Sequence, residues 1–547
     1  MNLLSCIQLT TTMESFPKDA IAISPLDGSS IVTANIMIRR PIYNGLSMIG
    51  YANQIANGQI TDHLSYADFE KNYSSTSSDI NLVTEFVNQV GLTVIDVAPA
   101  AATIKISGTA ENFNNTFKTN LQTIQTPNHV FTGYNGVLYI PAELEGIIEY
   151  IRGLHNSAKI SHHAISANTS ANIQSALTPL QVATAYNFPL SNGYGVCVGI
   201  IEYGGGYTTQ NLTSSFGRIG LSNPKTVDID VNGATNNPTD SSASPEVMLD
   251  IYVCGGVVPN AKLAIYFAPN TIFEDPINTA IHDKVNSPSV LSISWAGGET
   301  EWSSSAIAAV EAVFAQAVIL GITICVSSGD QGSSYANSNT KQVLYPASSY
   351  YVVGVGGTTL TLSSSMRLNE VAWSGSGGGV STVFSLPSYQ TGLSIKTYPS
   401  LTSSSLAVRG VPDVSANADP NTGYQFYWGS QNTYSQYGGT SAAAPLIAGL
   451  IAQLIQLTGR RIGMANTLFY ANTSAFSDVT SGNNAYGSVS GYTATNGWDA
   501  VTGLGVPIGS NIFRLVNIGA VYPVNNFGFR PTSGAVWPRV VSGVRSN

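Results

Sequence analysis

Continuous apolar stretches alternate with helical stretches between residues 193 and 360, and this alternation constrains the fold more than any other feature. Stretches that are apolar at every position are typical of a parallel sheet covered by helices on both faces. Ligands of such sheets bind at the carboxyl ends of the strands. We therefore expect an α/β domain whose functional residues follow its strands. The apolar stretches cover residues 193–206, 261–269, 289–298, 318–330 and 350–360, and helical ones cover 244–254 and 305–318.

The chain has 547 residues, which is too many for one core, so we expect further units. Short strands and amphipathic helices near the N-terminus predict a ferredoxin-like α+β domain, with residues 145–156 as a helix. A Ser-, Ala- and Asn-rich segment follows, and we expect an exposed linker there that is open to proteolysis. The expected organisation is an irregular leader at 1–28, the α+β domain at 29–155, the linker at 156–176, the α/β domain at 177–515 and a tail at 516–547.

Few side chains carry charge, which limits the classes of function. Charged residues make up 10% of the chain and the net charge is −9, so the basic footprint of a nucleic-acid-binding protein is missing. A surface of low charge also suffers little self-repulsion in acid. We expect a monomer without a membrane span, and the four cysteines predict neither a metal site nor a disulfide framework. No clear signal peptide is seen; a secreted, lysosome-like or particle-associated acidic setting would suit the composition.

The strongest local signal is the motif GGTSAAAP, which places Ser441 at the start of a long apolar stretch. Glycines permit close approach of another backbone, small neighbours leave room for a substrate, and a helix N-terminus favours developing negative charge. These are the surroundings that a nucleophilic serine needs. The alternative is that Thr440 or Ser441 only caps the helix, but the eight-residue context favours a nucleophile.

A nucleophilic serine needs a base, and histidine is the usual one. Five of the six histidines precede the α/β domain, and His282 lies in an ordinary helical stretch, so a carboxylate is the expected base. Glu246 and Asp250 in SPEVMLD are four residues apart and share one face of a helix. Two such carboxyls can share a proton and acquire split pKa values. The alternative for this pair is a solvated helix face.

Asp330 in SSGDQG follows one of the apolar stretches. At the carboxyl end of a strand, a protonated carboxyl could donate a hydrogen bond to an oxyanion. That role requires low pH or a raised pKa. The alternative is a plain turn.

Together these motifs resemble the sedolisin family of serine-carboxyl peptidases, which includes kumamolisin-like and tripeptidyl-peptidase members. The order Glu246, Asp250, Asp330 and Ser441 also matches the family, and the resemblance runs from about residue 27 to residue 515. It implies a subtilisin-like fold, polypeptide substrates, and a prodomain that inhibits the site until the linker is cut. It also implies that Ser441 is the nucleophile, Glu246 the base, Asp250 its partner and Asp330 the oxyanion acid.

The resemblance further implies an extended network and one structural Ca²⁺. Glu202 in GIIEYGGG and Trp295 in SISWAGG match positions that extend the hydrogen-bond network in some members; a loop residue and a core residue are the alternatives. Hard cations prefer oxygen ligands. Thr495 stands where the family commonly has glycine. The implied calcium ligands are the carboxylates of Asp478 and Asp499 and the carbonyls of Val479, Thr495 and Gly497.

Three functions therefore stand beside one another. The first is an acid endopeptidase or tripeptidyl-peptidase that activates itself by removing its prodomain. The second is a catalytically silent member that serves as a binding or structural protein, which loss of a site residue would have favoured; all four are present. The third, a neutral subtilisin that uses His282, is the least favoured. The sequence leaves the subsite preferences and the cleavage site in the linker open.

Overall fold

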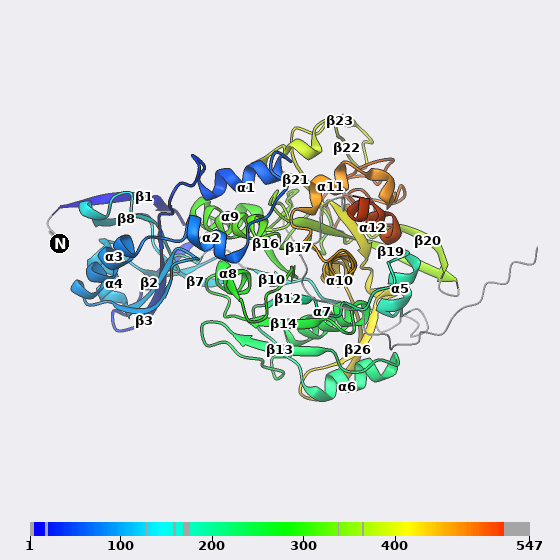
Figure 1. The fold of residues 1–547 in the computed structure, drawn as a ribbon, viewed down its shortest axis with the longest axis horizontal. Coiled ribbons are helices and arrows are strands. Elements are labelled where there is room, and N and C mark those ends of the chain that lie inside the picture. The colour runs from blue at the N-terminus through cyan, green and yellow to red at the C-terminus, as the bar shows by residue number, and fades with distance from the viewer. Residues whose placement is uncertain are drawn as a thin grey trace, which may run out of the picture.

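The computed structural model describes residues 5–16, 20–126, 129–156, 160–167, 176–336, 339–363 and 366–518. The chain forms a smaller N-terminal domain, blue in Figure 1, that packs against a larger α/β domain. From residue 519 on, the predicted tail lies outside the described residues, as does much of the predicted linker.

An eight-stranded sheet forms the centre of the larger domain, as the continuous apolar stretches predict. Neighbouring strands run parallel, except that β19 and β20 pair antiparallel. In spatial order the sheet contains β13 (Lys225–Asp230), β14 (Lys262–Phe267), β12 (Cys197–Glu202), β15 (Val290–Ile293), β17 (Thr323–Ser327), β19 (Val353–Ser363) and β20 (Met366–Ala372), and β25 (Val414–Asn417) also pairs with β19.

Helices cover both faces of this sheet, because consecutive side chains of each buried strand point to opposite sides. In β12, Val198 and Ile200 enter one apolar core, and Cys197 and Ile201 enter the other. The first core also holds α5 (Pro179–Ala185), α6 (Thr209–Arg218), α7 (Ser244–Val257), α10 (Thr440–Thr458), α11 (Ala465–Tyr470) and α12 (Gly509–Ile518). The second holds α8 (Glu274–His282), α9 (Ser304–Ile319) and α1 (Met48–Ala56).

Helix α10 is long and apolar enough to cross a membrane by length and composition. Nearly all of it is buried inside the protein, where it contacts α7 and several strands of the sheet. The helix is therefore the central core helix of the α/β domain, and Figure 1 shows it end-on beside α7.

The N-terminal domain has its own apolar core and an antiparallel sheet in the order β4, β5, β3, β9. With two crossover segments containing helices, this order is that of the predicted ferredoxin-like fold. The elements are β3 (Ile31–Ile38), α2 (Tyr66–Tyr73), α3 (Ser77–Gln89), β4 (Thr93–Ala98), β5 (Thr103–Thr109), α4 (Ala110–Phe117) and β9 (Ile148–Arg152).

Two local predictions for this domain are wrong. The helix predicted over residues 145–156 is instead the edge strand β9, because a short apolar run fits either structure and pairing with β3 decides it. The irregular leader predicted at 1–28 contains β1 (Cys6–Glu14) and β2 (Ile21–Pro25). These strands pair with β8 (Gly136–Pro141) and with β6 (Gln122–Gln125), which also pairs with β7 (Val130–Gly133).

Buried polar contacts join the two domains. The guanidinium of Arg152 lies 3.3 Å from Glu274 Oε1 on α8 and 3.7 Å from Glu14 Oε1 on β1. Glu14 in turn accepts a hydrogen bond from the hydroxyl of Ser303, the residue that caps α9. The three charged groups are buried, so docking of the N-terminal domain depends on their mutual pairing.

The remaining strands form small separate sheets. These are β10 (Ser161–His162), β11 (Ile165–Ser166), β16 (Trp295–Gly298), β18 (Leu344–Tyr345), β21 (Gly379–Ser385), β22 (Ser394–Lys396), β23 (Ser403–Ser405), β24 (Val408–Val411), β26 (Tyr424–Trp428), β27 (Thr433–Gly438), β28 (Phe476–Ser477) and β29 (Val506–Pro507).

Candidate active site

Ser441 lies in the first turn of α10, just after a residue whose backbone conformation is open to glycine but not to other residues. Gly439 precedes the helix with φ of 112°, and no side chain caps the helix, so the capping alternative for Thr440 and Ser441 is wrong. The hydroxyl of Ser441 is buried and has no hydrogen-bond partner among the described residues. It is therefore free to point at a reacting group.

Pro445 and Ser294 prepare the backbone around this serine. A proline has no N–H, so Pro445 leaves the carbonyl of Ser441 without its usual helical donor. The hydroxyl of Ser294, which follows β15, lies 3.5 Å from that carbonyl. The same hydroxyl is 2.9 and 3.0 Å from the two carboxyl oxygens of Asp250. Ser294 thus links α10 to the carboxyl pair of α7.

Glu246 and Asp250 lie one turn apart on α7, and both are completely buried. The alternative of a solvated helix face is therefore wrong. Among the described residues, Oε1 of Glu246 has no hydrogen-bond partner. Glu202, at the end of β12, accepts a 2.9 Å hydrogen bond from the indole N–H of Trp295. The structure thus brings the predicted pair of carboxyls and the predicted extension together at one end of the sheet.

Asp330 follows β17 and is held by the start of α10. Its Oδ1 accepts hydrogen bonds from the backbone N–H of Thr440 at 2.7 Å and from the Thr440 hydroxyl at 2.8 Å. Its Oδ2 is buried without a partner among the described residues. One carboxyl oxygen is therefore fixed, and the other faces the site.

Burial raises the pKa of three of these carboxyls well above the usual range. For Asp250 and Glu202, desolvation is the main cause, and the neighbouring carboxyls, Glu246 among them, add to it. For Asp330, burial outweighs the hydrogen bonds from Thr440, which act in the opposite direction. Each group therefore holds its proton to a higher pH than a free carboxyl does.

A segment from the predicted linker crosses this site. β10 pairs antiparallel with β16, and β11 pairs antiparallel with β27, so the segment forms ladders with both rims. The expectation of an exposed linker is therefore wrong for residues 160–163, where Ile160 and His163 are buried, whereas Ile165 and Ser166 are exposed. The reason is that backbone pairing, rather than an apolar pattern, holds the segment in place.

Two consecutive linker histidines lie at the site: His162 ends the first ladder, and His163 follows it. Nδ1 of His162 is 3.3 Å from Oε2 of Glu246. Burial lowers the pKa of His162, but Glu246, together with the backbone of Ser242 and with Asp330, outweighs burial and raises that pKa. A Cβ added to Gly439 would overlap both the carbonyl oxygen of His163 and Oδ2 of Asp330. The two oxygens therefore lie against the same face of Gly439.

His282, the alternative base, lies elsewhere. Its Nε2 is 2.8 Å from the side-chain oxygen of Gln316 on α9, and its ring packs on Phe69 of the N-terminal domain. Burial lowers the pKa of His282 to about 4. This histidine belongs to the domain interface.

The predicted calcium ligands lie in two loops that contact each other near the end of the chain. Gly497 N–H donates to Asp478 Oδ2 at 2.8 Å, and Thr495 N–H donates to Asp499 Oδ2 at 2.9 Å. Asp499 also accepts from the N–H groups of Val501 and Thr502. Burial raises the pKa of Asp499 to about 7, and neither aspartate pairs with a cationic side chain in the described part.

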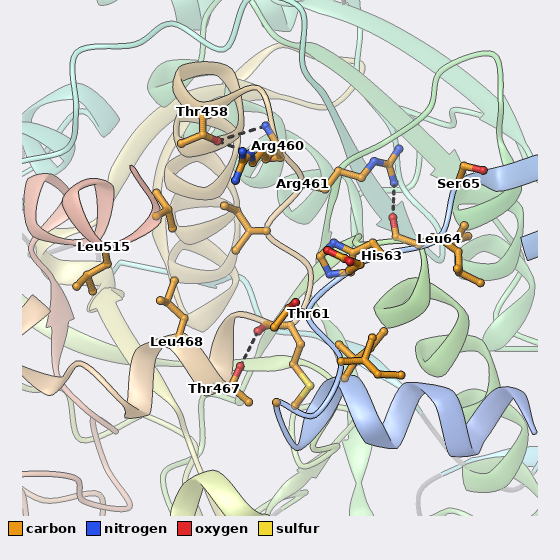
Figure 2. Close-up of a pocket in the computed structure, with 18 of the residues that line it drawn as sticks. Thr61, His63, Leu64, Ser65, Thr458, Arg460, Arg461, Thr467, Leu468 and Leu515 are labelled. Carbon is orange, nitrogen blue, oxygen red and sulfur yellow. Dashed lines mark hydrogen bonds between the residues drawn. The ribbon is translucent and has the colours of Figure 1, made fainter. Parts of the chain in front are cut away.

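A separate cavity of about 990 Å³ lies at the junction of the two domains, away from the catalytic candidates. Figure 2 shows His63 inside it, beside Arg461. A Cβ at Gly321 or Gly463 would collide with the His63 ring, so the ring packs directly against these two glycines. Burial and Arg461 lower the pKa of His63, and Asp62 raises it less.

The fold and the buried serine–carboxyl site define a serine peptidase of the subtilisin-like class, and family comparisons agree. Residues 219–476 match the subtilase family model, and residues 18–157 match the model of the pro-kumamolisin activation domain. Kumamolisin from Bacillus sp. (strain MN-32) is 36% identical over 518 residues, covering 90% of this chain and 93% of its own. The chain therefore belongs to the sedolisin family of serine-carboxyl peptidases.

Two further comparisons concern sedolisin itself. Sedolisin from Pseudomonas sp. (strain 101) is 29% identical over 515 residues, covering 87% of this chain and 84% of its own. The solved structure of the Pseudomonas sedolisin, a serine-carboxyl proteinase in complex with pseudo-iodotyrostatin, aligns with a TM-score of 0.55 at 29% identity and covers 63% of this chain and 98% of that one. The chain is thus a proteolytic enzyme with an N-terminal activation domain, made as a zymogen.

Sequence reasoning missed three contributors to the site. Thr440 holds Asp330, Ser294 links Asp250 to α10, and the paired histidines of the linker occupy the cleft. A signal for Ser294 was present, because it is a polar residue inside the apolar stretch predicted over residues 289–298. The histidine pair carried no such signal, since its segment lacks apolar periodicity.

Proposed function

We propose that this enzyme hydrolyses peptide bonds in acid through an acyl-enzyme on Ser441, with Glu246 as base and Asp330 as oxyanion acid. The observation that carries the proposal is the linker segment, which lies across the site as a substrate would. It is paired on both sides by β-ladders, with the carbonyl of His163 against Gly439 and Asp330. Antiparallel strand addition is a common way to bind an extended peptide.

The proposed reaction has two steps. Ser441 Oγ attacks the scissile carbonyl carbon while Glu246 takes the hydroxyl proton, and the carbonyl oxygen becomes an oxyanion. The C–N bond then breaks, the amine leaves with the proton from Glu246, and an ester on Ser441 remains. Water, deprotonated by Glu246, hydrolyses that ester and regenerates the serine.

Asp250 positions the base in this proposal, and Asp330 stabilises the oxyanion. Asp250 is fixed by Ser294, and its raised pKa keeps it protonated, so it can donate a hydrogen bond to the Glu246 carboxylate and orient it toward Ser441. Asp330 is oriented by Thr440 through Oδ1, which leaves a protonated Oδ2 to donate to the oxyanion. Glu202, which accepts a hydrogen bond from Trp295, extends the same network and interacts electrostatically with Glu246.

Acid action follows from the same groups. A carboxyl with a raised pKa is protonated below that pKa, and it loses the proton as the pH rises through it. Asp330 can donate to an oxyanion only while protonated, so the proposed chemistry declines on the alkaline side. A carboxyl with an ordinary pKa is still partly deprotonated at acidic pH, whereas an imidazole is protonated there and can no longer act as a base.

The linker geometry supports the bond between His163 and Ala164 as the proposed site of self-cleavage. His163 lies at the end of the first ladder, its carbonyl faces the oxyanion acid, and the second ladder begins two residues later. Until that bond is cut, the linker fills the cleft and the N-terminal domain holds it there. In this proposal the same linker segment inhibits the enzyme while it is intact and activates it when it is cut.

A structural Ca²⁺ completes the proposal. The donor set fits the ion, because the exposed carboxyl of Asp478 and the buried carboxyl of Asp499 lie on two glycine-containing loops that supply oxygen ligands, and neither pairs with a cationic side chain in the described part. Asp478, Asp499 and the carbonyls of Val479, Thr495 and Gly497 would hold it. The ion would supply positive charge that fixes the two loops together.

Replacing Ser441 with alanine tests the proposal. The full-length S441A chain should remain intact on a denaturing gel after incubation near pH 4 and should not cleave peptides, whereas the native chain yields a smaller fragment. S292A is the matched control, because Ser292 is a buried serine of β15 whose hydroxyl has no partner in the described part of the chain. Self-cleavage by S441A at the native rate would overturn the proposal.

A further inference from the structure

The side chain of His163 is buried at the end of β17, and we call the space it fills the His163 pocket. Its Nδ1 lies 2.9 Å from the hydroxyl of Ser327, the last residue of that strand. Ser327 is completely buried, and its hydroxyl has no second hydrogen-bond partner among the described residues. The pocket thus offers one buried hydrogen-bonding group to whichever side chain enters it.

The position of this pocket relative to the reaction follows from the linker. The His163 carbonyl faces Asp330, so the His163 side chain is that of the residue directly before the scissile bond. Ser161 and His162, which pair with β16, precede it on the same side of that bond. This placement rests on the function proposed above.

We propose that Ser327 is a specificity-determining residue, and that its pocket favours histidine, or another uncharged side chain that hydrogen-bonds, directly before the scissile bond. An aliphatic side chain there would leave the buried Ser327 hydroxyl unpaired. A buried polar group without a partner costs more than the net gain from one hydrogen bond. Sites built to hydrogen-bond a substrate group therefore discriminate against analogues that lack it.

Charge in the pocket argues against a cationic side chain. Burial is the main cause that lowers the pKa of His163, to about 3, and the adjacent His162 adds to it. The titratable groups around His163 are thus His162 and, next to its carbonyl, Asp330. Among the described residues, no carboxylate lies beside the imidazole ring. A lysine or arginine would be desolvated there without an ion-pair partner.

A pH signature follows from the need for a neutral imidazole. A free histidine has a pKa of about 6.5, and the bound one has a lower pKa, so binding is strongest above pH 6.5 and weakens as the pH falls. The neutral fraction of free histidine drops about 50-fold between pH 6.5 and pH 4.5. Cleavage after histidine should therefore lose about 50-fold relative to cleavage after glutamine over this range.

The experiment compares peptides that match the linker and differ only before the bond, as His, Gln, Leu or Lys followed by Ala-Ile-Ser. They are offered to the self-processed native enzyme and to S327A, with S292A as control. We expect kcat/KM for the His and Gln peptides to fall about tenfold in S327A, with the Leu peptide within about twofold. An equal effect on His and Leu peptides, or none on either, would overturn the inference.

A second arm uses the full chain and does not depend on S327A folding well. With Ser327 present, H163L should slow self-cleavage about tenfold at pH 6, and H163Q should stay near the native rate. Equal rates for H163L, H163Q and the native chain would contradict the role of the pocket. Self-cleavage by S441A would overturn the proposed function. If S441A does not cleave itself and S327A has no selective effect on the peptides, only the inference about Ser327 is overturned.

Discussion

Replacing Asp330 with asparagine tests the oxyanion acid, because the structure fixes how the new amide must lie. In the native protein, Oδ1 accepts from the N–H and the hydroxyl of Thr440 at 2.7 and 2.8 Å. The amide oxygen of D330N must keep that place, since an NH₂ group there would face the backbone N–H donor. The amide nitrogen then takes the position of Oδ2, next to the carbonyl of His163.

The two substitutions of this residue should therefore differ sharply. D330A removes the donor, and loss of one oxyanion donor lowers kcat by about 10²–10³-fold, or about 3–4 kcal/mol. D330N retains a donor that never loses its proton, so we expect kcat within about tenfold of native. For native Asp330 the pKa is raised, so the donor persists below that pKa and is lost above it. The alkaline decline of kcat should thus shift upward in D330N.

The assay is kcat against pH from 3 to 8 on a linker-derived peptide, using self-processed enzyme. E311Q serves as the control: Glu311 is a buried carboxyl whose pKa burial raises to about 7, and it contacts Tyr345 rather than the site. Its pH profile should match the native one. If folded D330N is as inactive as D330A, or keeps the native alkaline limb, then Asp330 does not act as an oxyanion donor.

The remaining predictions concern metal and domain docking. A calcium chelator should lower the melting temperature of the native enzyme by several degrees, because a ligand present at 100 times its Kd stabilises the folded state by about 2.7 kcal/mol. D499N should melt at a lower temperature than the native enzyme, and the chelator should not change its melting temperature. Identical melting of the native enzyme with and without chelator would rule the site out. H63A should weaken retention of the cleaved N-terminal domain at pH 7, measured by gel filtration. Because burial and Arg461 lower the pKa of His63, protonation below about pH 6.5 favours release in the native protein; a pH dependence of retention that H63A leaves unchanged would show that His63 is not involved.

The sequence predicts the elements whose pattern is strong and repeated. Strands β12, β14, β15, β17 and β19 are mostly apolar because side chains on both of their faces are buried, and each lies where the apolar stretches place it. The end of each strand then places its functional residue, as Glu202 follows from β12 and Asp330 from β17. The resemblance to the family then predicted that these residues belong to one site.

Elements that depend on pairing with a distant segment are not predictable in this way. Strand β9 is a short apolar run that fits a helix equally well, and only its partner β3 makes it a strand. The linker carries a polar composition typical of an exposed loop, yet Ser161 and His162 pair with β16. In both cases the decisive hydrogen bonds come from backbone groups, which leave no mark on side-chain periodicity.

The polar composition of the linker has a physical role in the proposed mechanism. A substrate-like inhibitor must bind through its backbone and yet be released after cleavage, so it cannot depend on a large apolar anchor. Its two ladders supply backbone bonds on either side of the His163–Ala164 bond. Cutting between them turns one bidentate ligand into two weak ones, because each fragment retains only a single ladder of two paired residues and its effective concentration falls. Cleavage by itself therefore weakens inhibition, before any change in the domain interface is needed.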